Sequence, residues 1–223
     1  MQFNLTKEQG NRRLLIFFTG WGTTPEVAAH LTPLPECDYL TAYDFRTLSP
    51  EAIPPLSDYK EVYMVGWSMG VWALDRLAPH LPIPTKAIAI NGTPLPMHNQ
   101  YGIPDEIFRG TLEGLDDDNR ARFNRRMCGG KKLLAVFNSF AARSTEDLRE
   151  ELYGTYLQVK NLPDDTLPRL AWSEAIVSER DLIVPTANQL AYWQRHGVPC
   201  RQLKGVGHYP LLEYQSWEEL IQL

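Results

Sequence analysis

The chain has 223 residues, a formal net charge of −5 at pH 7, and 43% hydrophobic residues. This ordinary globular composition excludes a disordered chain, a collagen-like fibre and a disulfide-stapled scaffold, and the length suffices for one sizeable core. The acidic balance argues against a general nucleic-acid-binding protein, although a local basic patch is compatible with it.

Targeting and membrane signals are absent from the sequence pattern. The apolar run 14–18 is shorter than the h-region of a signal peptide, and no other run approaches the ~20 apolar residues of a membrane span. The three cysteines, Cys37, Cys128 and Cys200, are widely separated and odd in number, which indicates a reducing compartment rather than a disulfide or zinc site. We therefore expect a cytoplasmic protein with no membrane association.

Short apolar segments alternate with helix-like segments in the first part of the chain, which is typical of a parallel sheet covered by helices on both faces. The pattern predicts strands over 14–18, 39–43, 61–65 and 87–90, with helices over 25–31 and 69–77. The same alternation returns near the C-terminus, with strands expected over 171–177 and 201–203 and helices over 186–194 and 212–221.

The middle of the chain has a different pattern. Strand signals are absent between 94 and 169, and helices are predicted over 112–127, 133–140 and 145–157, the last capped by Ser144. A helical insertion within an α/β pattern predicts a cap above the strand ends, so we expect a core made of 1–93 and 170–223 and a cap insertion of 94–169. Alternatively, these helices pack against the sheet like the others.

The motif Gly66-Trp67-Ser68-Met69-Gly70 lies between a predicted strand and a predicted amphipathic helix. This is the setting of a nucleophile elbow, in which a tight turn projects the serine hydroxyl and glycines permit a close backbone crossing. Ser68 is therefore the candidate nucleophile. The alternative is a glycine-rich turn that contains a serine by chance.

A serine hydroxyl needs a base to remove its proton and a third group to orient that base. His208 lies in a glycine-rich loop between the last predicted strand and the last predicted helix. This position resembles the one from which α/β-hydrolases present their base; the alternative is an ordinary loop histidine. The other four histidines, which we interpret as structural or solvated, are His30, His80, His98 and His196.

The chain order Ser, Asp, His favours an acid in a loop that follows a strand. Asp181 closely follows the predicted strand 171–177, and the apolar residues after it are suited to burying its carboxylate beside an imidazole. Glu179 is the competitor. We favour Asp181 because Glu179 is expected to point outward toward Arg180 or solvent.

Acyl transfer also needs two hydrogen-bond donors aimed at the oxyanion. The backbone N–H of Met69, directly after the candidate nucleophile, fits the first role. Trp21, in Thr19-Gly20-Trp21-Gly22 after the strand 14–18, fits the second through its own backbone N–H. Taken alone, this segment would be interpreted as an ordinary tight turn with a packing tryptophan.

Together these motifs resemble the α/β-hydrolase family over essentially the whole chain. The pairing of Gly20-Trp21-Gly22 with Gly66-Trp67-Ser68-Met69-Gly70 resembles, more narrowly, the BioG-type pimeloyl-[acyl-carrier protein] methyl ester esterases of biotin biosynthesis. The resemblance implies an α/β-hydrolase fold with a mostly parallel sheet, helices on both faces and a helical cap. It also implies a serine esterase that releases methanol from an acyl-carrier-linked methyl ester.

By position, the resemblance implies Ser68 as nucleophile, His208 as base and Asp181 as orienting acid, with Trp21 and Met69 as oxyanion donors. The sequence departs from the common hydrolase pattern in having Thr19 where a histidine is usual and Val71 where a second small residue is usual. Only a short polar segment precedes the first core strand, which implies that the usual N-terminal antiparallel strands are reduced or missing.

A basic segment, 120–132, contains six basic residues and no acidic residue. On a helix Arg122, Arg125 and Arg126 would share one cationic face, which would steer and orient an acidic acyl carrier protein. The alternative is a solvated face balanced by the acidic residues just upstream, which are Glu113, Asp116, Asp117 and Asp118.

No metal or organic cofactor is expected, because no cluster of His, Cys or carboxylate residues has ligand spacing and no phosphate-binding loop is present. Two other functions remain open: a different carboxylesterase or thioesterase of the same fold, and a non-catalytic module that binds an acidic protein. The sequence does not indicate the oligomeric state.

Overall fold

The computed structural model describes residues 1–8, 10–140 and 143–223. These residues form one seven-stranded sheet in the order β1-β3-β2-β4-β5-β6-β7, in which β1 is antiparallel to β3 and all other neighbours are parallel. The strands are β1 (Gln2–Thr6), β2 (Arg13–Phe18), β3 (Cys37–Tyr43), β4 (Glu61–Trp67), β5 (Lys86–Ile90), β6 (Glu174–Ser178) and β7 (Cys200–Leu203).

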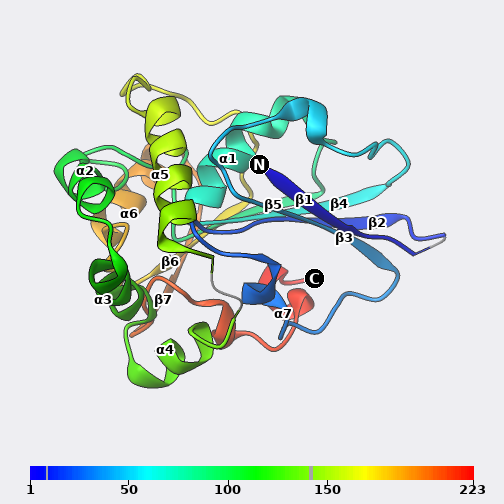
Figure 1. The fold of residues 1–223 in the computed structure, drawn as a ribbon. Helices are drawn as coiled ribbons and strands as arrows, with labels where there is room; N and C mark the ends of the chain where they lie inside the picture. The colour runs from blue at the N-terminus through cyan, green and yellow to red at the C-terminus, as the bar shows by residue number, and fades with distance from the viewer. Residues whose placement is uncertain (9, 141–142) are drawn as a thin grey trace.

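The helices are α1 (Met69–Leu77), α2 (Asp105–Glu113), α3 (Asp117–Cys128), α4 (Lys131–Phe137), α5 (Thr145–Val159), α6 (Thr186–Arg195) and α7 (Trp217–Ile221). Short 3-10 turns cover Pro25–Ala28, Pro50–Ala52, Ala78–His80 and Leu211–Glu213. Figure 1 shows α2–α5 gathered at one end of the sheet. This is the end at which the parallel strands terminate, since α5 bonds to the loops that follow β2 and β3.

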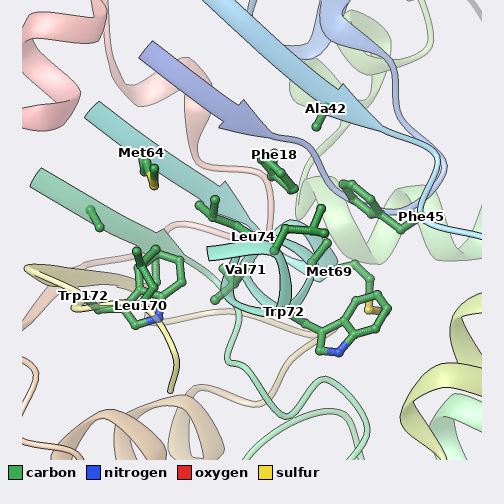
Figure 2. Packing of buried hydrophobic residues seen from close by; sticks show 14 of the residues in the cluster. Phe18, Ala42, Phe45, Met64, Met69, Val71, Trp72, Leu74, Leu170 and Trp172 are labelled. Carbon is green, nitrogen blue, oxygen red and sulfur yellow. The ribbon is translucent and has the colours of Figure 1, made fainter. Parts of the chain in front are cut away.

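The core has two halves, one on each face of the sheet. Side chains alternate along a strand, so Leu14, Ile16 and Phe18 of β2 belong to the cluster that contains α1, whereas Leu15 and Phe17 belong to the cluster on the opposite face that contains α7. Figure 2 shows the first half, where side chains from the sheet and α1 meet. Both faces of the central strands are therefore apolar, as the continuous hydrophobic runs predict.

The parallel strands of the first part of the chain are confirmed within one or two residues, and so is helix 69–77. One strand was not predicted. β1 alternates between exposed and half-buried residues along an edge of the sheet, so its sequence lacks a continuous apolar run. The N-terminal antiparallel part is thus reduced to a single strand, which agrees with the expectation that it is reduced or missing.

Two predicted helices are wrong in extent. The segment 25–31 forms only the 3-10 turn Pro25–Ala28, and 212–221 is divided into the turn Leu211–Glu213 and α7. Ser216 begins α7 by accepting a hydrogen bond from the backbone N–H of Glu219, and this cap fixes a new helix start within the predicted one.

The predicted helix 112–127 is also wrong, because α2 ends at Glu113 and α3 begins at Asp117. Asp116 caps α3 through the backbone N–H of Asn119. Strand 171–177 is shifted, since β6 covers Glu174–Ser178. Between β5 and β6 the described residues contain no strand, and Ser144 caps α5 as predicted. In the described residues no helix has the length and apolarity needed to cross a bilayer.

Candidate active site

Ser68 occupies a strained turn between β4 and α1. Its φ of 57° and ψ of −122° lie outside the conformations that a serine ordinarily adopts. The turn is possible because Gly70 crosses the end of β2 so closely that a Cβ would lie 2.3 Å from the carbonyl oxygens of Phe18 and Thr19. The strand, glycine and serine pattern therefore forms the expected elbow, with the hydroxyl at its apex.

The structure brings Ser68, His208 and Asp181 together. Nε2 of His208 lies 2.7 Å from Oγ of Ser68, and Nδ1 of His208 lies 2.8 Å from Oδ2 of Asp181. Three segments converge to make this contact: the elbow after β4, the loop after β6 and the loop before the last helix. The His208 side chain is 2% exposed, so its two hydrogen bonds are shielded from water.

Both carboxylate oxygens of Asp181 accept hydrogen bonds, and these bonds fix its orientation. Its Oδ1 accepts the backbone N–H groups of Ile183 and Val184 at 2.8 and 2.9 Å, which leaves Oδ2 facing the imidazole. An acceptor at this position fixes the tautomer with hydrogen on Nδ1, so that Nε2 is free to accept the serine proton. Glu179, in contrast, is exposed and accepts the backbone N–H of Gly205.

Two polar residues that sequence reasoning missed support this arrangement. Gln189 of α6 donates from Nε2 to Oδ2 of Asp181 at 2.9 Å. Asn91, just after β5, donates from Nδ2 to the backbone carbonyl of His208 at 3.0 Å, and its φ of 46° is a left-handed conformation that asparagine tolerates. Neither residue lies in a sequence motif. Asn91 contacts distant segments at Ser178 and His208, whereas Gln189 contacts the loop 181–184 that directly precedes α6.

The two residues whose backbone N–H groups are expected to bind an oxyanion are both at the site. Trp21 and Met69 line the same cavity as Ser68 and His208. Among the described residues, neither backbone N–H donates to another protein group. The Trp21 ring packs edge to face against Phe123 at 5.1 Å, and its Nε1 donates to the carbonyl of Leu148 in α5 at 3.0 Å.

The cavity beside Ser68 is small and mainly apolar, with a volume of about 50 Å³. A groove of about 850 Å³ adjoins it between α2 and α3. The cavity and the groove share five lining residues, which are Ile107, Thr111, Phe123, Arg126 and Leu182. The small cavity beside Ser68 is therefore continuous with the larger groove.

Arg122, Arg125 and Arg126 all line this groove and are exposed on α3. None of them forms an ion pair with an acidic side chain in the part of the chain that the structure describes. Exposed Ile107 and Leu182 add apolar surface at the same place. The mouth of the groove thus combines positive charge with apolar contact area.

The described residues contain no group of His, Cys, Asp and Glu side chains arranged to hold a metal ion. All three cysteines are free thiols, and burial raises the pKa of Cys37 to about 11 and that of Cys128 to about 12. Deprotonated thiolates at these positions are therefore disfavoured at neutral pH.

Comparisons with known proteins show the family and the fold of the chain. The model of the family described as pimeloyl-ACP methyl esterase BioG matches residues 1–220. The chain belongs to the BioG family. The crystal structure of BioG from Haemophilus influenzae superimposes with a TM-score of 0.91 at 33% identity, over 99% of this chain and 100% of that one. An uncharacterized protein of H. influenzae is 35% identical over 93% of both chains.

More distant structures show the α/β-hydrolase fold. A lipase-esterase related protein from Clostridium acetobutylicum has a TM-score of 0.64 at 16% identity, over 94% of this BioG-family chain and 93% of that one.

A malonyl-[acyl-carrier protein] O-methyltransferase from Bacteroides fragilis is 39% identical over 89% of this chain. The match spans only 40% of the length of that relative.

Proposed function

We propose that this protein is a serine esterase that hydrolyses pimeloyl-[acyl-carrier protein] methyl ester to pimeloyl-[acyl-carrier protein] and methanol, in the cytoplasmic synthesis of biotin. The observation that carries the proposal is the unbroken hydrogen-bond chain from Oγ of Ser68 through His208 to Asp181, at 2.7 and 2.8 Å. Membership of a family described by this activity supports the choice of ester.

In the first half of the reaction, Oγ of Ser68 attacks the carbonyl carbon of the methyl ester while Nε2 of His208 takes the hydroxyl proton. Asp181 stabilises the imidazolium that forms, through the hydrogen bond to Nδ1. The tetrahedral intermediate collapses when His208 returns the proton to the leaving methoxide oxygen, which releases methanol and leaves an acyl group on Ser68.

In the second half, His208 removes a proton from a water molecule, and the hydroxide attacks the acyl carbonyl. Collapse of this second intermediate transfers the proton from His208 to Oγ of Ser68 and releases the carboxylic acid, which loses its remaining proton to water to become the carboxylate. In both halves, the backbone N–H groups of Trp21 and Met69 bind the oxyanion. A donor in this role is typically worth about 3 kcal/mol in the transition state.

The similarity to the B. fragilis methyltransferase supports a methyl ester as the bond that is cut. By its name, that protein forms an O-methyl ester on an acyl group carried by acyl carrier protein, and a homologue of this chain makes up 40% of it. One polypeptide would thus contain a segment that makes such an ester and a segment that removes one.

The groove between α2 and α3 supports a carrier-linked substrate. We assign 94–169 to a cap over the strand ends, in which Arg122, Arg125 and Arg126 face the acidic surface of the carrier. The acyl arm then passes Ile107 and Leu182 to reach Ser68. Opposite charges on the two proteins accelerate encounter, and this acceleration weakens as the ionic strength rises.

The reaction is tested by supplying one pimeloyl-carrier methyl ester and measuring released methanol and released free thiol. Methanol alone supports the proposal, whereas free thiol alone identifies a thioesterase. A fluorophosphonate probe tests the nucleophile separately. Labelling that disappears in Ser68→Ala supports the serine mechanism, and a wild-type protein that is not labelled would indicate a non-catalytic module that binds an acidic partner.

Carrier docking is tested with the charge reversals Arg122→Glu and Arg125→Glu. We expect KM for the carrier-linked ester to rise at least about tenfold, while hydrolysis of a free monomethyl ester is unchanged. Lys60→Glu is the matched control, because Lys60 precedes β4 at the opposite end of the sheet. An equal effect of Lys60→Glu would indicate a dependence on net charge alone.

A further inference from the structure

The loop that follows β2, residues 19–23, is held by an unusual concentration of hydrogen bonds on one carbonyl. The carbonyl oxygen of Gly20 accepts the hydroxyl of Thr23 at 2.7 Å, the backbone N–H of Thr23 at 3.3 Å and the hydroxyl of Thr19 at 3.3 Å. Thr23 is 4% exposed, so its hydroxyl is not available to water.

This carbonyl belongs to the same peptide group as the backbone N–H of Trp21. A trans peptide is planar and directs its C=O and N–H to opposite sides, and the described chain contains no cis peptide. Gly20 and Trp21 line the catalytic cavity, whereas Thr23 lines a separate cavity beside α4. Holding the carbonyl toward Thr23 therefore directs the N–H of Trp21 toward the catalytic cavity.

These hydrogen bonds are needed because glycine at position 20 allows the Gly20–Trp21 peptide to adopt the opposite orientation. Gly20 lacks a Cβ, as the site requires, since a Cβ would lie 3.0 Å from the ring of Trp67. The freedom of glycine also lets the peptide rotate and present its carbonyl to the cavity instead of the N–H. The hydroxyl of Thr23 stabilises the orientation in which the N–H faces the reaction.

The next N–H along the loop is held by a buried charge in the cap. Oε2 of Glu151, in α5, accepts the N–H of Gly22 at 3.2 Å, and Oε1 accepts the N–H of Phe45 at 2.9 Å. Glu151 is fully buried and paired with Arg143 at 2.5 Å. Each carboxylate oxygen thus orders a loop at the end of a different strand, β2 and β3.

From these contacts we propose that Thr23 and Glu151 are positioning residues that aim the Trp21 N–H at the oxyanion of the reaction. Thr23 holds the carbonyl side of the Gly20–Trp21 peptide, and Glu151 holds the following peptide. Neither side chain touches the substrate. The inference rests on the proposed esterase function, because it assigns a role within that reaction.

The first test compares Thr23→Val with Thr23→Ser. Valine keeps the shape of threonine and loses the donor to Gly20, whereas serine keeps the donor. We expect kcat for the methyl ester to fall about tenfold in Thr23→Val with little change in KM, and to stay near the wild-type value in Thr23→Ser. Equal kcat values in wild type and Thr23→Val, or an equal fall in Thr23→Ser, would overturn the role of Thr23.

The second test compares Glu151→Gln with Asp147→Asn. Both residues pair with Arg143, but only Glu151 bonds to the loop that follows β2. If Glu151 positions this loop, Glu151→Gln lowers kcat at least about tenfold, while Asp147→Asn lowers only the melting temperature. Similar kcat values in the two variants would reduce Glu151 to a structural role.

The rate of fluorophosphonate labelling separates failure of this inference from failure of the proposed function. The phosphonyl oxygen of the probe needs the same N–H donors, so labelling should slow in Thr23→Val by about the same factor as kcat. No labelling of the wild-type protein would refute the esterase function itself. Labelling of wild type and Thr23→Val at equal rates would refute only the positioning role.

Discussion

The side-chain amide of Gln189 donates to Oδ2 of Asp181 at 2.9 Å, the oxygen that also bonds to His208. The same amide nitrogen donates to the backbone carbonyl of Val184 at 2.8 Å, so it is shared between the loop after β6 and the carboxylate. Gln189 is fully buried in α6. Helix α6 thus contributes to the orientation of Asp181, although Gln189 does not line the catalytic cavity.

We expect Gln189→Leu to lower kcat for the ester about tenfold with little change in KM. Leucine has a similar size and cannot donate, so Asp181 loses a hydrogen bond of the kind typically worth about 1.5 to 3 kcal/mol. Steady-state kinetics of the purified variant measure this change.

Asn188→Leu is the matched control for Gln189→Leu. Asn188 is the preceding residue of α6 and donates to the carbonyls of Asn99 and Gly102, away from Asp181. Its replacement should lower the melting temperature and leave kcat unchanged. If both leucine variants lose kcat equally, α6 acts through stability alone and Gln189 has no special role.

Asn91→Asp tests the support of the His208 loop. Nδ2 of Asn91 lies 2.8 Å from Oγ of Ser178, 3.0 Å from the carbonyl of His208 and 3.3 Å from that of Gly207. A carboxylate oxygen in this place would face two carbonyl oxygens without a proton to share. We expect a loss of about 3 kcal/mol, which lowers the melting temperature by roughly 10 °C, with a fall in kcat.

Asn99→Asp controls for the change in charge. Asn99 is exposed, and its Oδ1 accepts the backbone N–H of Asp105, which an aspartate oxygen accepts equally well. The melting temperature should therefore stay within about 1 °C of the wild type. A wild-type melting temperature for Asn91→Asp would contradict the assigned contacts.

The parts of the site that the sequence predicts are those with a local signature. Ser68 is marked by glycines that a tight strand-to-helix turn requires, and Trp21 by its place directly after a buried strand. Gln189, Asn91 and Glu151 have no such mark. Each acquires its partners only when the chain folds, and those partners lie 5 to 129 residues away in sequence.

The same distinction applies to the fold. Strands buried on both faces are predicted from their apolar runs, whereas β1 is polar on an edge and depends on pairing with β3. The break between α2 and α3 has a local sequence signal, although the spacing of apolar residues favours one continuous helix. Gly114 follows the last residue of α2, and Asp116 caps α3.

Replacement of Gly70 tests the backbone geometry of the elbow, and replacement of Gly110 in α2 is the control. In Gly70→Ala the Cβ would lie 2.3 Å from two carbonyl oxygens, so we expect a loss of at least about 3 kcal/mol or failure to fold. Gly110, within α2, has open space around its Cα, so Gly110→Ala should be neutral or stabilise by up to about 1 kcal/mol. Urea unfolding measures both. A Gly70→Ala variant as stable as the wild type would contradict the close crossing.

Acid unfolding tests the ion pairs that Asp147 of α5 forms with Arg46 and Arg143. Hydrogen bonds from Arg143 and Arg46 lower the pKa of Asp147 to about 2. A folded-state pKa below the unfolded value of ~3.9 stabilises the protein at higher pH. That stability is lost as the pH falls from about 4 to 2.

Asp147→Asn should therefore have a lower melting temperature than the wild type at pH 6, and the difference should close toward pH 2. Asp165→Asn, at an exposed site, should follow the wild type throughout. A difference for Asp147→Asn that is independent of pH would show that the carboxylate charge contributes nothing.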